Sequence, residues 1–260
     1  MEVITSKSNE KVKYIKSLND KKFREKYNSY FVEGIKVINE IMEQAIDDIT
    51  FIACFLDNLK DSEIIEKIKQ KNIPIIYLSK EIFEYITDTK SPQGILAVIN
   101  KKEKYIDYNK DIIILDGVSD LGNLGTIIRN SVAFDINNII CINNVADIYS
   151  PKCVRSSMSN ILKCNIKYEE NIEDIFSKLK EKGYTIYGTD LLSDIYLKNQ
   201  NFKNEKTAFV FGNESKGMSK EIKNKCDKLF KIEMEDNVES LNVASASSII
   251  LYKNYLKNFK

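Results

Sequence analysis

The fold is decided by the stretch Ile112-Ile113-Ile114-Leu115-Asp116-Gly117-Val118-Ser119-Asp120-Leu121-Gly122-Asn123-Leu124-Gly125-Thr126. Its first four residues are an apolar run typical of a buried strand, and the glycines that follow indicate a turn. We expect a strand over Ile112–Leu115, a glycine-rich loop, and a helix over Thr126–Ala133. The stretch therefore predicts one strand–turn–helix unit.

The same alternation continues to the C-terminus. Further strands are expected at Asn138–Ile142, Asn165–Tyr168, Thr185–Gly188, Thr207–Phe211 and Leu229–Met234. Helices are expected at Val154–Leu162, Ile172–Lys182, Lys220–Cys226 and from about Leu241. This spacing predicts an α/β domain with a mostly parallel sheet and helices on both faces. Ligands of such sheets bind outside the carboxyl ends of the strands, so the loops after Leu115, Phe211 and Met234 should share one rim.

Residues 1–100 have a different texture. A basic helical start carries Val12, Ile15 and Leu18 at helical spacing. Strands are expected at Tyr30–Glu33, Ile49–Phe55, Pro74–Leu78 and Ile95–Ile99, and helices at Ile35–Gln44 and Ser62–Lys71. The polar run Asn100–Lys104 indicates a linker. We therefore expect a first domain over 1–100, a short linker over 101–110 and a second domain over 111–260.

Composition excludes several classes of protein. With 43% hydrophobic and 30% charged residues, the chain is an ordinary globular sequence. Its apolar runs are too short to span a membrane, and its N-terminus has no secretion signal. Histidine is absent, which excludes a Ser-His-Asp triad and a histidine metal centre. The spacing of the five cysteines favours reduced thiols, so we expect a cytoplasmic protein without a metal site.

The formal net charge of +1 does not indicate a nucleic-acid partner, but the charge is uneven. Residues 1–30 carry eight Lys or Arg against four Asp or Glu, a local net charge of +4. A solvated helix face explains this pattern, and so does contact with an RNA backbone. Both interpretations stay open at this point.

Three segments together carry a family resemblance. They read Asn123-Leu124-Gly125-Thr126-Ile127-Ile128-Arg129, then Phe209-Val210-Phe211-Gly212-Asn213-Glu214-Ser215-Lys216-Gly217, then Glu239-Ser240-Leu241-Asn242-Val243-Ala244. The first is neither a dinucleotide fingerprint nor a Walker loop. In this order they resemble the motifs of the SpoU (TrmH) family of RNA ribose 2'-O-methyltransferases. Ser215 and Glu233 depart from the family pattern, which commonly has Gly and Pro at these positions.

The resemblance extends more weakly to the N-terminal part. Ile4-Thr5-Ser6, Phe31-Val32-Glu33-Gly34 and Pro92-Gln93-Gly94-Ile95 are similar to the substrate-binding domain that precedes the catalytic domain in many members. The resemblance implies a smaller α/β domain of the L30e-like kind, a trefoil knot in the C-terminal domain, and a homodimer formed through that domain. It also implies that Arg129 can serve a site completed by the partner chain.

The resemblance further implies S-adenosylmethionine as cofactor and RNA as substrate. By position, the cofactor-binding residues are Gly212, Asn213, Ile232, Met234 and Leu241, and the catalytic residues are Arg129, Asn123, Glu214, Ser240 and Asn242. An arginine is a poor base because it stays protonated in proteins. Our hypothesis is that Arg129 stabilises the developing alkoxide and the adjacent phosphate. Asn123, Ser240 and Asn242 would orient the ribose and phosphate, and Glu214 would hold the loops.

Alternatives remain for the residues and for the function. Ser240 as a helix N-cap and Glu214 as a charge at a helix N-terminus are structural readings of the same residues. Ribosomal RNA of the 23S type is favoured over transfer RNA as substrate. A base-nitrogen methyltransferase of the same superfamily and a non-catalytic RNA-binding protein on the same scaffold are the competing functions.

Overall fold

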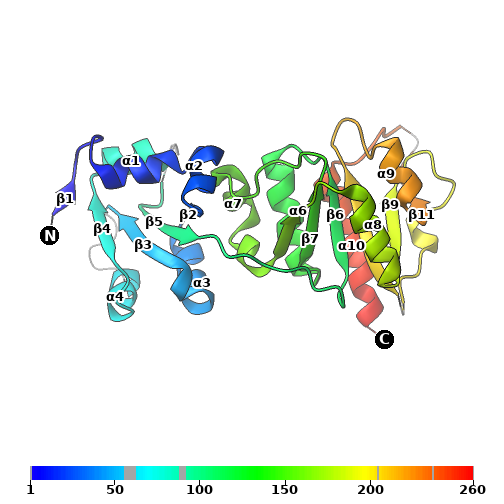
Figure 1. Cartoon of the computed structure of the whole chain (residues 1–260), viewed down its shortest axis with the longest axis horizontal. Helices are drawn as coiled ribbons and strands as arrows, with labels where there is room; N and C mark the ends of the chain where they lie inside the picture. The colour runs from blue at the N-terminus through cyan, green and yellow to red at the C-terminus, as the bar shows by residue number, and fades with distance from the viewer. Residues whose placement is uncertain (1, 56–62, 88–91, 204, 236, 260) are drawn as a thin grey trace. The chain divides into compact units, whose positions relative to one another are not determined.

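The computed structural model describes residues 2–55, 63–87, 92–203, 205–235 and 237–259. The chain forms two compact units, one of residues 1–103 with 149–162 and the other of residues 104–148 with 163–260 (Figure 1). Segment 149–162 groups with the N-terminal residues, although it lies within the second expected domain. The division into an RNA-binding domain, a linker and a catalytic domain stays a prediction.

The N-terminal unit is built on a mixed sheet with strand order β1-β4-β3-β5-β2. Strand β4 is parallel to β1 and β3, whereas β5 is antiparallel to β3 and β2. The strands are β1 (Val3–Ile4), β2 (Ser29–Glu33), β3 (Ile49–Cys54), β4 (Ile75–Leu78) and β5 (Ile95–Asn100). The helices are α1 (Glu10–Ser17), α2 (Lys21–Lys26), α3 (Ile35–Gln44), η1 (Ile46–Asp48), α4 (Glu63–Gln70), α5 (Lys80–Thr87) and α7 (Pro151–Ser157), followed by η2 (Asn160–Lys163).

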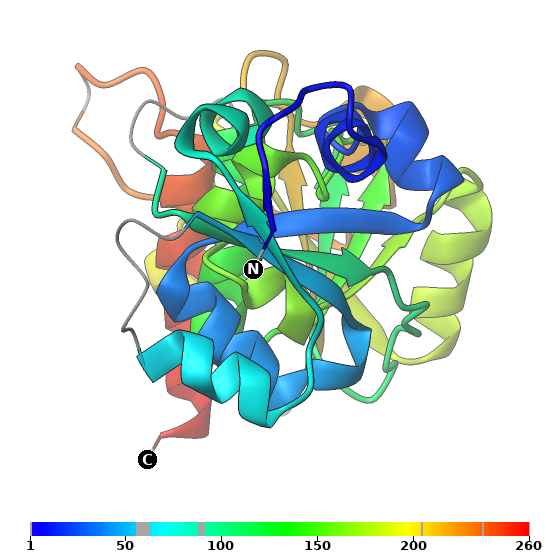
Figure 2. The same cartoon turned by 90° about the vertical axis from the view of Figure 1, so that its left-hand side faces the viewer.

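Helices cover both faces of this sheet. Val12 and Ile15 of α1 and its C-cap residue Leu18 pack with Ile82 and Phe83 of α5 in one buried cluster on one face of the sheet. Helices α3 and α4 lie on the opposite face, as Figure 2 shows. The helical spacing read from the sequence at the N-terminus is confirmed, because Val12, Ile15 and Leu18 have no exposed surface.

The C-terminal unit is built on a fully parallel sheet with strand order β11-β9-β10-β6-β7-β8. The strands are β6 (Ile112–Asp116), β7 (Asn138–Ile142), β8 (Asn165–Tyr168), β9 (Tyr184–Thr189), β10 (Lys206–Gly212) and β11 (Lys228–Phe230). The helices are α6 (Leu121–Ala133), α8 (Ile172–Glu181), α9 (Lys220–Lys225) and α10 (Val243–Tyr255), with short 3-10 turns η3 (Leu197–Asn199) and η4 (Leu256–Asn258).

The central strands are buried on both faces, as parallel strands covered by helices must be. Every residue of β6 and of β7 is buried. Ile175 of α8 and Ile222 of α9 pack on one face with Ile112 and Ile114. Helix α10 packs against α6 and β10, away from that cluster (Figure 1). The expected parallel sheet with helices on both faces is confirmed, and the trefoil knot stays a prediction.

Several expected boundaries are wrong, and each has a local cause. The expected strand Leu229–Met234 ends at Phe230, since Lys231 makes only an isolated bridge to Tyr196. The expected helix Val154–Leu162 stops at Ser157, because Met158 and Ser159 have left-handed φ angles of 51° and 67°. The sequence also missed α2 and α5. Ser62, the expected start of the helix now labelled α4, lies outside the described residues.

No helix within the described ranges combines the length and the apolar character needed to cross a membrane.

Candidate functional site

Two of the motif segments start side by side. Strands β6 and β10 are neighbours in the sheet, and their register pairs Leu115 with Phe211 and Asp116 with Gly212. The chain turns out of both strands at the same edge, with Gly117 at a φ of 67°. The rim predicted from the sequence is therefore confirmed for the first and second motifs.

The first motif differs from the expected glycine loop. Helix α6 begins at Leu121, so Gly122 and Gly125 lie inside its first turns. Asp120 is the N-cap, and its carboxylate accepts a hydrogen bond of 2.8 Å from the Asn123 amide. The turn is confined to residues 117–119, where one glycine is sufficient. The Asp N-cap accepts a hydrogen bond from one of the free amides at the helix start, and the helix therefore continues through Gly122 and Gly125.

The N-terminus of α6, where a bound anion could accept hydrogen bonds from backbone amides, is occupied by a carboxylate of the same chain. The Glu214 carboxylate accepts hydrogen bonds from the backbone amides of Ser119, at 3.2 Å, and Asp120, at 3.0 Å. The Ser119 hydroxyl donates a further bond of 3.1 Å. Burial on its own raises the pKa of Glu214, but hydrogen bonds from the backbone and from Asn123 outweigh it and hold this pKa below its ordinary value. Glu214 is therefore ionised and held firmly between two motifs.

Asn123 joins the third motif to this carboxylate. Its Nδ2 donates to Glu214 Oε1 at 3.2 Å, and its Oδ1 accepts from Asn242 Nδ2 at 2.9 Å. Asn242 in turn caps α10, since its Oδ1 accepts from the amides of Ala244 and Ser245. All three motifs thus meet in one chain of hydrogen bonds. The cap is Asn242, so the reading of Ser240 as N-cap is wrong.

The second motif is a tight loop closed by Asn213 and Gly217. The two residues exchange backbone hydrogen bonds of 3.1 and 2.9 Å, and Gly217 has a φ of 64°. Asn213 Nδ2 also donates to the Gly117 carbonyl at 2.8 Å. A Cβ on Gly212 would lie 2.3 Å from the backbone of Gly217 and of Met218. Only glycine fits at position 212, because real Cβ atoms do not approach backbone so closely.

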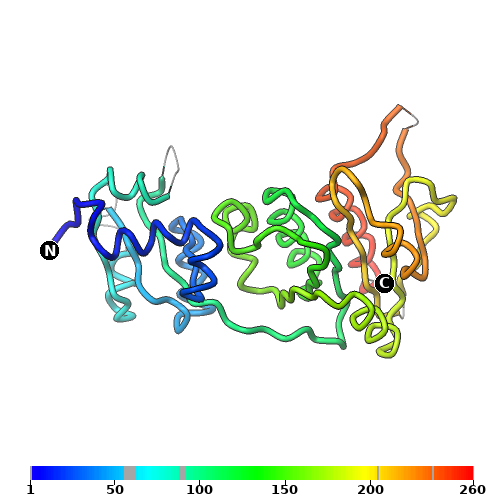
Figure 3. The backbone as a smooth tube through the Cα atoms, turned by 45° about the horizontal axis from the view of Figure 1, so that its top comes forward, coloured from blue at the N-terminus to red at the C-terminus, as the bar shows by residue number. Residues whose placement is uncertain are grey.

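A cavity of about 420 Å³ opens beside this loop. Its lining combines apolar side chains with polar and charged ones. The lining includes the residues expected to bind a cofactor, namely Gly212, Asn213, Ile232, Met234 and Leu241. It also includes Glu214 and Ser240. Figure 3 follows the chain from β11 through the loop that carries Ile232 and Met234 into α10. The structure therefore brings the second and third motifs to one cavity.

Arg129 lies outside the lining of this cavity. It is exposed on α6, six residues beyond Asn123, which places it about 120° around the helix from that side chain. Within the described part of the chain, neither Arg129 nor Ser240 makes a side-chain hydrogen bond or ion pair. Both differ in this respect from Asn123, Asn242 and Glu214, whose polar atoms already have partners in the fold.

Sequence reasoning missed two groups at this site. Asp190 and Lys223 line the cavity and form an ion pair of 2.9 Å. Burial opposes ionisation of Asp190, but hydrogen bonds from Lys223 and from the Leu192 amide lower its pKa. Buried Asp116 links the start of the loops to α9, accepting bonds from Asn143 Nδ2 at 2.6 Å and from the Ser219 amide at 3.1 Å. The position of Asp116 and Asp190 at strand ends was the available signal.

Another cavity, of about 520 Å³, lies in the N-terminal unit between β1, β4 and the start of α1. Its lining mixes Glu2 and Glu10 with Lys11 and apolar side chains. It contains no residue of the three motifs. A larger volume alone does not identify a site of chemistry.

Comparison with known proteins decides the family. The model of the SpoU rRNA Methylase family matches residues 110–252, which is more than half of the chain. The chain belongs to the SpoU rRNA methylase family. A model described as the MRM3-like substrate binding domain matches residues 9–97. The resemblance seen in the motifs is thereby confirmed for both parts of the chain.

Individual SpoU relatives align over almost the whole chain. A protein of Bacillus subtilis named 23S rRNA (guanosine(2553)-2'-O)-methyltransferase RlmP is 30% identical over 252 residues, covering 97% of this chain and 98% of the relative. The AdoMet-bound rRNA methyltransferase of Sinorhizobium meliloti superposes with a TM-score of 0.85 at 24% identity, covering 100% of this chain and 98% of the other. AviRb of Streptomyces viridochromogenes in complex with AdoMet gives 0.85 at 21% identity, covering 97% and 99%. The two structures establish that the fold is shared.

Proposed function

We propose that this SpoU protein is an enzyme that transfers a methyl group from S-adenosylmethionine to a ribose 2'-hydroxyl of RNA. The observation that carries the proposal is the hydrogen-bonded meeting of all three motifs around Glu214, beside the cavity that the second and third motifs line. A protein that only binds RNA does not need a cavity of small-molecule size beside these motif loops. The B. subtilis relative is named for the same chemistry.

The cavity fits the cofactor in size and character. Its volume of about 420 Å³ lies within the range of small-molecule sites. Phe211, Phe230 and Ile232 supply apolar surface for an adenine ring, and Gly212 also lines the cavity. We propose that Gly212, Asn213, Ile232, Met234 and Leu241 hold the cofactor. When bound there, S-adenosylmethionine supplies an electrophilic methyl group on its sulfonium.

The residues of the chain divide into two roles in this proposal. Glu214, Asn123 and Asn242 position the loops, because their polar atoms are engaged with one another and with backbone. Glu214 in particular is a poor general base, since its pKa is lowered and the donors around it stabilise the carboxylate. Of the five residues expected to be catalytic, Arg129 and Ser240 are the two whose polar atoms remain for the substrate. Ser240 orients the ribose, while Arg129 binds the adjacent phosphate and stabilises the developing alkoxide. The 2'-hydroxyl proton would pass to that phosphate or to solvent, and S-adenosylhomocysteine would be the leaving group.

Arg129 can fill this role if the site is completed by a second copy of the chain. Helix α10 and its extension expose Ile249, Tyr252, Leu256 and Phe259, with exposed fractions of 41, 52, 44 and 55%. Their spacing of three, four and three residues places them along one helix side, opposite the buried Ile250 and Leu251. We propose that a homodimer buries this stripe and brings Arg129 to the partner's cavity. Multi-angle light scattering of a Tyr252→Glu, Leu256→Glu variant should then report a monomer.

Ribosomal RNA of the 23S type is the proposed substrate. The B. subtilis relative, named for 23S rRNA, aligns with both units of this chain, including the one matched by the substrate-binding model. Transfer RNA is the alternative. Since ribosomal RNA is made and modified in the bacterial cytoplasm, we propose that the protein acts there.

The proposal is tested by methyl transfer from labelled S-adenosylmethionine to an unmodified 23S rRNA transcript and to a tRNA transcript. We expect label in the 23S transcript and, after digestion to nucleosides, a 2'-O-methylated nucleoside. Label on a base nitrogen would support the other reaction of the superfamily. Calorimetry that detects no binding of S-adenosylmethionine would support the non-catalytic RNA-binding alternative.

A further inference from the structure

The two helical faces of the N-terminal unit carry opposite charge. Helices α1, α2 and α5 together hold seven Lys and four Glu besides the buried Arg24, a net charge of +3 without that arginine. Helices α3 and α4, on the other side of the sheet, hold three Lys and four Glu, a net charge of −1. A polyanion is therefore attracted to the α1, α2 and α5 face and not to its opposite.

Two lysines converge on one exposed ring at this face. Lys7 Nζ lies 4.6 Å and Lys16 Nζ 4.8 Å from the centre of the Tyr85 ring, which is 38% exposed. Lys16 also donates to the Tyr85 carbonyl at 2.7 Å, which fixes its ammonium group. Neither lysine has a carboxylate within ion-pair distance in the described ranges. Two ammonium groups held near one ring without a counter-charge form a site for a phosphate group.

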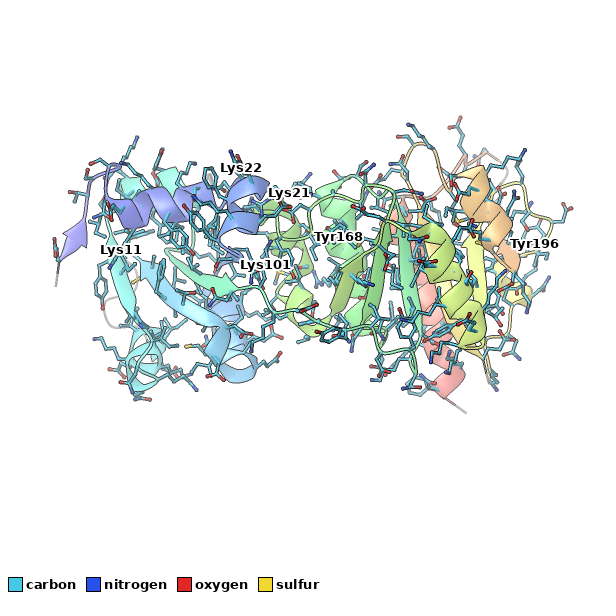
Figure 4. All side chains as sticks on the ribbon, viewed as in Figure 1. Lys11, Lys21, Lys22, Lys101, Tyr168 and Tyr196 are labelled. Carbon is cyan, nitrogen blue, oxygen red and sulfur yellow. The ribbon has the colours of Figure 1, made fainter. Side chains whose placement is uncertain are left out.

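The neighbouring helix α2 presents further cations from a fixed position. Arg24 is only 3% exposed, and it donates to the Leu18 carbonyl at 2.6 Å, which ties α2 to the end of α1. Lys21 and Lys22 project outward from α2, as Figure 4 shows. The buried arginine fixes the position of α2, so binding of a polyanion has to order only the exposed lysine side chains and not the helix that carries them.

We infer that the α1, α2 and α5 face of the N-terminal unit binds the RNA backbone, with one phosphate held between Lys7 and Lys16 beside Tyr85. This inference rests on the proposed function and adds to it the surface through which the RNA is held. The positive start of the sequence is then an RNA contact and not only a solvated helix face. The α3 and α4 face contributes nothing to the affinity.

The test compares two charge reversals in the full-length protein. Lys7→Glu, Lys16→Glu changes the proposed phosphate site, and Lys69→Glu, Lys71→Glu makes the same change in charge at the end of α4. Affinity for an unmodified 23S rRNA transcript is measured by filter binding at several salt concentrations. We expect the first variant to lose at least about tenfold in affinity, and the slope of its logarithmic salt dependence to fall by about 0.7 to 0.9, the value for one lost phosphate contact. The control should bind like the unaltered protein.

Lys16 takes part in a local hydrogen bond, so the single variant Lys7→Glu is measured as well, and thermal unfolding is followed for each protein. Equal weakening by the two double variants would overturn the inference, because net charge alone would then explain the loss. Unchanged binding of the Lys7, Lys16 variant, with methyl transfer intact, would overturn it and leave the proposed function standing. If the unaltered protein neither binds the transcript nor methylates it, the proposed function and the inference fail together.

Discussion

Glu214 and Arg129 are both motif residues, but the fold uses them in opposite ways. Glu214 accepts hydrogen bonds from Ser119, Asp120 and Asn123, and burial and these donors fix its position. Arg129 is exposed and, among the described residues, has no partner. The difference indicates that a family motif contains two kinds of residue. Some hold the loops in place through hydrogen bonds within the fold, and a few keep their polar groups available to bind the substrate.

The largest effect is expected where the loops have no room at all. Gly212→Ala places a Cβ 2.3 Å from the backbone of Gly217 and of Met218, so the second motif must shift. We expect the rate of methyl transfer to fall at least about 100-fold, since a misplacement of about 1 Å at a site costs about that much in rate. Calorimetry should also show weaker binding of S-adenosylmethionine. Gly183→Ala is the control, because its φ of 78° is strained but nothing lies within 4 Å. Equal loss of affinity in both variants would contradict this account.

Replacing Arg129 tests most directly whether it binds the substrate, in contrast to Glu214, which positions the loops. Arg129→Ala removes an exposed group that makes no side-chain hydrogen bond or ion pair within the described residues, so thermal stability and cofactor affinity should stay unchanged. The rate of methyl transfer should fall by about 100- to 1,000-fold, as for other groups that stabilise a developing oxyanion. Arg129→Lys should recover only part of this rate, since it keeps the charge but not the forked donors. A large drop in melting temperature would show that Arg129 is structural after all.

The sequence predicted the sheet and its rim but not how the loops close. Strands β6, β7 and β10 were found because parallel strands buried on both faces read as continuous apolar runs. The glycines of the first motif were misread as a loop, since local sequence cannot show that Asp120 and Glu214, 94 residues apart, satisfy the amides of the turn and the helix start. The end of β11 was missed for a similar reason. Its apolar pattern continues to Met234, but its neighbour β9 offers partners only as far as Phe230.

The sequence also could not show which motif residues position the loops and which remain for the substrate. Asn123, Ser240 and Asn242 are all polar motif residues and were given one role. The structure shows that Asn123 and Asn242 bind each other at 2.9 Å, whereas Ser240 lines the cavity. Such pairing depends on tertiary contacts between residues 119 positions apart, which no periodicity reports.

Glu214→Gln tests whether the hydrogen-bonded centre of the three motifs needs the negative charge of residue 214 or only the size of its side chain. The amide keeps the size of the side chain, but one of its ends now donates toward the amides of Ser119 or Asp120. We expect a loss of stability of about 1 to 3 kcal/mol and a moderate fall in cofactor affinity. The carboxylate has a lowered pKa in the folded state, so its contribution is present above the unfolded value near 4.5 and is lost as the pH falls through the folded value. The stability difference between the two proteins, measured by urea unfolding, should therefore narrow below pH 4.5.

The smallest effect is expected at Asn242, whose partners are a helix start and one side chain. Asn242→Ala removes the cap of α10 and the bond to Asn123, which should cost about 1 to 2 kcal/mol in unfolding free energy. Asn242→Asp keeps the capping oxygen but cannot donate to Asn123, and it brings a second negative charge toward Glu214. If Asn242 only caps the helix, the Asp variant should be as active as the unaltered protein. If it aligns the first and third motifs, as its bond to Asn123 indicates, the Asp variant should retain a capped helix and yet lose cofactor affinity in calorimetry.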